Sequence, residues 1–257
     1  MGTSAPHPGS GRGTPLVPAW ADPGNPAPSP PADPQRFREF RTQMGKFAAT
    51  GGDGNLRSAL KSFAAKASGG TSTGARRFTA MMGAGAGAIG AFSGPGGIAG
   101  GLERAGVDLA SLRGASLDTV IEAIARAFAP DNADHDKVEV ALREALTVVL
   151  QDVPEFNVET FQGFDDDTYV DLVAVFVENC ALQHILSECG PTWDRAGDAM
   201  QQQARENSLR ETIRAEIAQH LEPIAVRGVT SMTRDQLTAV QVAVVAGVLS
   251  SWESYDD

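Results

Sequence analysis

Apolar residues recur at intervals of three and four along most of this chain, and this spacing restricts its fold more than any other feature of the sequence. Residues three or four apart share one face of an α-helix, whereas the faces of a strand alternate at every residue. The longest such face comprises Tyr169, Leu172, Val173, Phe176, Val177, Cys180, Ile185 and Leu186. No segment shows convincing strand alternation, so we predict an all-α fold, a multi-helix bundle-like domain.

The ends of the predicted helices carry matching signals. Asp33 followed by Pro34 is typical of a helix start, Ser116 is placed to cap a helix that ends before Pro130, and Thr233 with Gln236 forms a capping box. Further helices are expected over about 55–67, 134–150, 166–189 and 198–221. Phe176 and Val244 are expected in the core, because each lies centrally in an apolar face.

Composition divides the chain into three parts. Residues 1–33 are rich in proline and glycine and are expected to form a disordered N-terminal arm with few folded contacts. Residues 34–104 form a basic, Gly/Ala-rich helical region, and residues 105–257 form an acidic all-α domain. Residues 1–104 hold 11 Lys and Arg against 5 Asp and Glu, and the remainder holds 10 against 27. This acidic majority argues against a nucleic-acid coat protein.

The arm contains two features with functional potential. Gly2 follows Met1, so removal of the initiator methionine would leave an unhindered α-amine; Pro6 breaks the myristoylation pattern at its Ser/Thr position. The only apolar island of the arm is PLVPAWAD (residues 15–22). Its Leu16, Val17 and Trp20 are candidates for docking a partner, with the alternative that Trp20 folds back on its own domain.

Basic side chains accompany the aromatic face of the first predicted helix and extend to the segment before the glycine-rich run. The candidate docking residues among them are Arg36, Arg38, Arg41, Arg76 and Arg77. Basic residues beside aromatic ones can bind nucleic acid, but aromatic residues at helical spacing are more often part of a core. We therefore expect these arginines to contact an acidic protein surface, for which the C-terminal half is a candidate.

Residues 78–102 carry no charge, and Gly or Ala fills more than half of the positions. A membrane span and a G-x-G-x-x-G dinucleotide site at Gly85, Gly87 and Gly90 are two alternatives. The break at Pro95 and the absence of a preceding strand disfavour them. We favour a closely packed helix in which small residues let another backbone approach. Its larger buried residues would be Phe78, Met81, Met82, Ile89 and Phe92.

No catalytic or metal-binding constellation is evident, so we expect neither an enzyme nor a cofactor. His184 lies near Cys180 and Cys189, but no second pair of zinc ligands accompanies them. Asp165, Asp166, Asp167 and Asp171 could hold Mg²⁺, and residues 131–139 offer many oxygens without the glycine and closing glutamate of a calcium loop. Both groups are interpreted as solvated helix caps. Two cysteines and no secretory signal favour a cytoplasmic protein.

Several short segments, taken in order, resemble the QatB family, the accessory protein of the Qat anti-phage defence system. They are MGTS at the start, PLVPAWAD, PQRFREFR (34–41), GDGNLRSAL (52–60), GGTSTGARRF (69–78), and Trp252 with Tyr255. The resemblance is strongest in the first 80 residues. It implies three partners: a QatA-like P-loop NTPase, a QatC-like enzyme similar to the queuosine-pathway synthase QueC, and a TatD-like nuclease. It also implies that the QatC-like enzyme joins a deazaguanine group to an N-terminal glycine, to which Gly2 corresponds.

The sequence thus favours a non-enzymatic scaffold that presents its arm to a modifying enzyme. A membrane-acting effector using residues 78–102 and a nucleic-acid adaptor using the arginines are the alternatives. We expect neither stable membrane insertion nor direct nucleic-acid binding.

Overall fold

The structure, a computed structural model, describes residues 15–25, 29, 31–93, 97–151, 157, 163–225 and 232–255. Over these ranges the chain is helical and contains no strand, so the predicted all-α fold is confirmed. The helices are α1 (Phe37–Thr50), α2 (Asp53–Ser62), α3 (Thr71–Arg77), α4 (Thr79–Ser93), α5 (Gly97–Arg104), α6 (Leu109–Leu112), α7 (Leu117–Phe128), α8 (His135–Leu150), α9 (Asp166–Cys189), α10 (Ala199–Ala225) and α11 (Arg234–Glu253). A π-helical turn (Phe63–Ala67) extends α2, and a 3-10 segment (Gly190–Ala196) follows α9.

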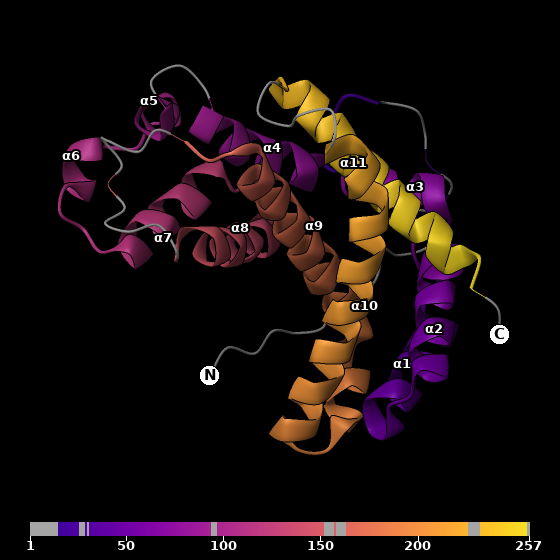
Figure 1. The fold of residues 1–257 in the computed structure, drawn as a ribbon. Helices are drawn as coiled ribbons and strands as arrows, with labels where there is room; N and C mark the ends of the chain where they lie inside the picture. The colour runs from indigo at the N-terminus through magenta and orange to yellow at the C-terminus, as the bar shows by residue number, and fades with distance from the viewer. Residues whose placement is uncertain are drawn as a thin grey trace.

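Helix α9 lies at the centre of the arrangement (Figure 1). It packs against α8 on one side and α10 on the other, and α4 and α1 also contact it. Helix α11 crosses α4, α3 and α10, while α7 covers α8. One continuous buried core draws side chains from helices on both sides of residue 104, including the predicted core residues Phe176 and Val244.

The helix starts predicted at Ser116 and Thr233 are confirmed by their hydrogen bonds, whereas the start predicted at Asp33–Pro34 is wrong: residues 34–36 form a turn and α1 begins at Phe37. The side chain of Ser116 accepts from the amide of Thr119, and Thr233 and Gln236 form a reciprocal capping box at α11. At α9, the carboxylate of Asp165 accepts a hydrogen bond from the amide of Thr168. Hydrogen bonds from the side chain and the backbone of Thr168 lower the pKa of Asp165. Each cap satisfies backbone N–H groups that the helix cannot.

The Gly/Ala-rich run forms α4, and its small residues do bring neighbours close. A Cβ on Gly85 would lie 2.5 Å from Cζ and 2.6 Å from Cδ1 of Phe176, a residue of α9. Its larger residues Phe78, Met81, Met82, Ile89 and Phe92 are all buried. The segment before the glycines is helix α3, not a strand, so the G-x-G-x-x-G match has no dinucleotide-binding context.

Helix α9 with the segment after it (Asp166–Ala196) is long and apolar enough to cross a membrane, by length and composition only. Most of this stretch is buried inside the protein, as in the core helix of a globular fold. Helix α4, by contrast, is among the shorter apolar helices. The length and composition of these helices are therefore only weak evidence for a membrane-acting effector.

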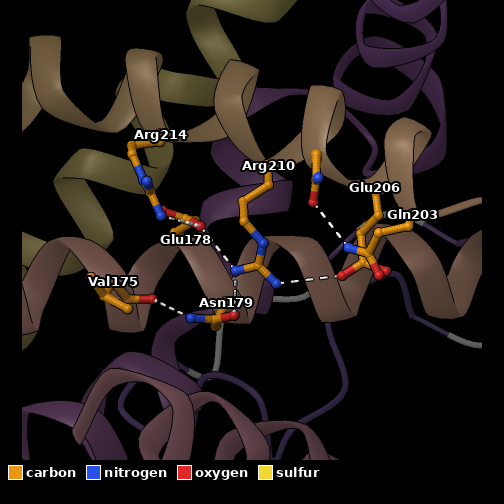
Figure 2. Close-up of polar contacts among 8 residues, drawn as sticks. Val175, Glu178, Asn179, Gln203, Glu206, Arg210 and Arg214 are labelled. Atoms are coloured by element: carbon orange, nitrogen blue, oxygen red, sulfur yellow. Dashed lines mark hydrogen bonds and ion pairs between the residues drawn. The ribbon is translucent and has the colours of Figure 1, made fainter. Parts of the chain in front are cut away.

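A polar cluster joins α9 to α10 (Figure 2). The buried carboxylate of Glu178 accepts from Nε of Arg214 at 2.7 Å and from Arg210 at 3.0 Å. Arg210 also donates to the side-chain oxygen of Asn179 at 2.9 Å, and the Asn179 amide donates to the carbonyl of Val175. These paired groups explain how the long polar helix α10 stays on an otherwise apolar neighbour.

Candidate functional site

Part of the expected free arm lies on the folded domain, and we name residues 15–22 the strap. The amide of Ala80, at the start of α4, donates to the carbonyl of Ala21 at 2.8 Å. The amide of Val17 donates to the hydroxyl of Ser29 at 3.0 Å, and both Val17 and Ala21 are buried. The predicted arm therefore has folded contacts from Pro15 onward, while Gly2 lies outside the described residues.

Two consecutive arginines at the end of α3 fasten the strap. Nε of Arg76 donates to the carboxylate of Asp22 at 2.8 Å, and its Nη2 donates to the carbonyl of Asn25 at 3.0 Å. The guanidinium of Arg77 lies 4.5 Å from the centre of the Trp20 ring, which is a cation–π contact. Trp20 thus folds back on its own domain, which is one of the two alternatives that the sequence left open.

Arg77 connects the strap to helix α8. Its guanidinium donates to both oxygens of Asp134, at 2.7 and 3.2 Å, and the ammonium of Lys137 lies 3.4 Å from the same carboxylate. Asp134 is fully buried, which corrects its interpretation as a solvated cap. A basic residue of the N-terminal half does meet an acidic residue of the C-terminal half here.

Arg41 in α1 and Arg36 just before it lie near Glu188 at the end of α9. Nε of Arg41 donates to the carbonyl of Glu188 at 2.8 Å. The guanidinium of Arg36 stacks 4.2 Å from the centre of the Phe37 ring. Burial lowers the pKa of Arg36, and the nearby carboxylate of Glu188 opposes this shift. Arg38 is exposed.

The strap covers a cavity of about 730 Å³. Four of the predicted docking residues line it: Leu16, Trp20, Arg36 and Arg77. Val17 and Arg76 hold the strap in place, whereas Arg38 and Arg41 do not line the cavity. The structure therefore brings residues from two separate predicted motifs to one place.

The residues of this site that were not predicted to dock a partner include Asp134, Lys137 and His184. Asp134 and His184 each lay in a motif noted for possible metal binding. In the part of the chain that the structure describes, no three His, Cys, Asp or Glu side chains lie close enough to hold a metal ion. Burial, together with the positive charges of Lys137 and Arg77, lowers the pKa of His184 well below its usual range. Its imidazole is therefore neutral.

Both cysteines are expected to be unreactive in the folded protein. Cys180 and Cys189 are buried free thiols, and burial raises the pKa of Cys189 to about 12. Because the thiolate is the reactive form, Ellman's reagent should detect almost no thiol in the native chain and both thiols after denaturation. Rapid native labelling of either cysteine would contradict this burial.

The helices and the cavity together define an all-α protein whose N-terminal strap forms part of the wall of a cavity. The sequence family described as "Qat anti-phage system associated protein QatB" matches residues 69–247. This match spans more than two thirds of the chain, so the chain belongs to the QatB family and is a component of the Qat anti-phage system. No curated protein and no solved structure matches it.

The residues that the family model matches are not the residues in which the short segments most resemble the family. Of the short segments that resemble the family, only GGTSTGARRF falls inside residues 69–247. The matched region holds Arg76, Arg77, Asp134, Lys137 and His184, whereas the strap precedes it. The side chains that receive the strap therefore lie within the family region.

Proposed function

We propose that this protein is a non-enzymatic, cytoplasmic scaffold subunit of a Qat defence complex that presents Gly2 to a QatC-like (QueC-like) modifying enzyme. The observation that carries this proposal is the fastening of the strap by the Asp22–Arg76 ion pair and the Trp20–Arg77 contact. It gives the N-terminal segment a defined point of attachment beside the cavity. A firmly attached tether raises the local concentration of its end at a docked partner.

The geometry limits how far Gly2 can reach. Pro15 follows Gly2 by thirteen positions along the chain, and an extended chain of that length spans at most about 45 Å. The modifying enzyme must therefore dock close to the strap. A free α-amine has a pKa of about 8, so a sizeable fraction is the nucleophilic form near neutral pH.

Mass spectrometry tests the modification directly. Coexpression with the QatC-like enzyme should yield protein that lacks Met1 and carries an added purine-like mass on the N-terminal peptide. Gly2→Leu should retain Met1 and abolish the adduct and the phage defence, with an unchanged melting temperature. Gly9→Leu is the matched control, because it alters the same segment but leaves the terminus intact.

The proposal would be contradicted by an unmodified mass in the presence of active enzyme, or by full defence from Gly2→Leu. Defence with an unmodified Gly2 would leave the strap itself as the better candidate for partner docking.

The scaffold role predicts that specific partner proteins bind this chain. Protein isolated from cells that express its neighbours should bring with it the QatA-like NTPase or the QatC-like enzyme, and the TatD-like nuclease is a third expected partner. Recovery of the chain with neither of the first two would contradict the scaffold role. Charge-removing variants such as Arg38→Ala should weaken capture without unfolding the chain, because this side chain is exposed.

The other two functions have less support from the structure. Arg76 and Arg77 are engaged by Asp22 and Asp134, so the basic set offers fewer groups for phosphates than its sequence indicates. Helix α4 is packed in the core, and a membrane effector would have to expose it. Salt-dependent DNA or RNA binding and membrane fractionation would detect these activities.

A further inference from the structure

The cavity beneath the strap has the features of a ligand site. These features do not depend on the proposed scaffold role. Its volume of about 730 Å³ lies within the range of small-molecule pockets. Residues from widely separated parts of the chain line it, including the strap, the end of α3, the start of α8 and the end of α9. A site built by so many elements can be shaped on more than one side.

Two phenylalanine rings pack against the imidazole of His184 in the cavity wall. The imidazole of His184 packs against Phe78 with ring centres 4.9 Å apart and against Phe63 at 5.9 Å, both in edge-to-face geometry. All three side chains line the cavity, and His184 is only 6% exposed. This part of the wall is apolar apart from the imidazole nitrogens.

Nδ1 of His184 and the hydroxyl of Ser68 belong to lining residues, are buried, and have no hydrogen-bond partner among the described residues. A buried polar atom without a partner is costly, and such atoms in native proteins commonly await a ligand or water. A neutral imidazole and a hydroxyl can each pair with an uncharged donor or acceptor.

The charged groups of the lining balance one another. Arg77 and Lys137 share the carboxylate of Asp134, and Arg36 lies near Glu188. Asp194 adds one further carboxylate at an exposed position. An anionic ligand would face these acids, and a cationic ligand would face the three basic groups, so the lining favours neither charge.

We propose that the cavity binds a small uncharged molecule with a planar ring and a hydrogen-bonding edge. The ring packs against the side of the cavity that Phe63, Phe78 and His184 form, and its polar edge pairs with His184 Nδ1 and Ser68 Oγ. The strap covers the bound molecule, with Trp20 in the cavity wall. Binding at this site does not require Gly2 or its modification.

Three nearly isosteric probes test the proposal on the full chain. Benzamide is neutral, benzoate is anionic and benzamidine is cationic, while ring size and planarity stay the same. Titration of each is followed by the ¹⁵N signals of the His184 imidazole, with His135 and His220 as internal references, and by the tryptophan emission of the chain. Benzamide should shift the His184 signals at least tenfold more tightly than either charged probe. Tighter binding of benzoate or benzamidine, or no His184 shift with any probe, would overturn it.

Two variants locate the binding. His184→Phe keeps an aromatic ring beside Phe63 and Phe78 but removes both nitrogens, and should weaken benzamide binding at least tenfold as read by tryptophan emission. Ser68→Ala removes only a hydroxyl and should weaken binding several-fold, so it provides the test if His184→Phe does not fold. Gly2→Leu is the matched control and should bind benzamide as the wild-type chain does. Unaltered affinity in a folded His184→Phe or in Ser68→Ala would contradict the assigned contacts.

Discussion

Replacing Asp134 with Ala is expected to lower the free energy of unfolding by about 3 to 5 kcal/mol. The substitution removes a fully buried carboxylate and leaves Arg77 and Lys137 without the partner that they share. Removing one member of a buried ion pair costs this much because the remaining charge stays desolvated. Urea denaturation of the variant and the wild-type chain measures the difference. The emission of Trp20 should also change, since Arg77 loses the contact that holds it over the ring.

Asp131 provides the matched control for this prediction. It lies three residues earlier and is exposed, so Asp131→Ala should change stability by at most about 0.5 kcal/mol. The double variant Arg77→Met with Asp134→Leu should be more stable than Asp134→Ala alone, because it leaves only the partly exposed Lys137, and not Arg77 as well, without the shared carboxylate. Equal stability of Asp134→Ala and Asp131→Ala would show that the carboxylate is not buried in an ion pair.

The helices could be predicted from sequence because their signals are local. The capping residues Ser116 and Thr233 lie within three residues of the amides they bind, and the apolar faces repeat within each helix. The close packing of α4 was also predictable, since a run of Gly and Ala without charge has few other uses in a buried helix. What the sequence could not supply was the identity of its close neighbour, Phe176 of α9.

The site depended on contacts between distant residues. Arg77 and Asp134 are 57 residues apart, and Asp22 is 54 residues from Arg76. An aspartate just before a helix is expected to be a solvated cap on local grounds alone, and a Pro/Gly-rich segment is expected to be free. Only the folded arrangement shows that Asp134 is buried and that residues 15–22 cover a cavity. The sequence indicated both Trp20 and Arg77 as candidate docking residues. It did not indicate that they contact each other.

The position of the family match adds to this interpretation of the site. Because residues 69–247 include α3, α8 and α9, the surface that receives the strap belongs to the region that defines the family. The strap and Gly2 precede that region. The proposed scaffold role therefore joins two parts of the chain: a helical domain with a cavity, and an N-terminal segment fastened to its rim.

Replacing Gly85 with Ala is expected to destabilise the protein by about 1 to 3 kcal/mol, although Ala is the better helix former. A Cβ at this position would lie 2.5 Å from Cζ and 2.6 Å from Cδ1 of Phe176, and closer still to Cε1. Phe176 is fully buried, so its ring cannot move aside without disturbing the core between α4 and α9. Inserting a methyl group into a well-packed core costs about this much. Urea denaturation or thermal melting measures the loss.

Gly90 makes the contrast sharp, because it lies in the same helix and, apart from the backbone of that helix, no atom of the described residues lies within 4 Å of an added Cβ. Gly90→Ala should therefore stabilise the protein by about 0.5 to 1 kcal/mol through helix propensity, giving two Gly→Ala changes of opposite sign. In the Gly85→Ala background, Phe176→Leu should cost less than it does alone, since the smaller side chain leaves room for the methyl group. If Gly85→Ala stabilised the chain as Gly90→Ala does, or if the two substitutions were simply additive, α4 could not be packed on α9 through this ring.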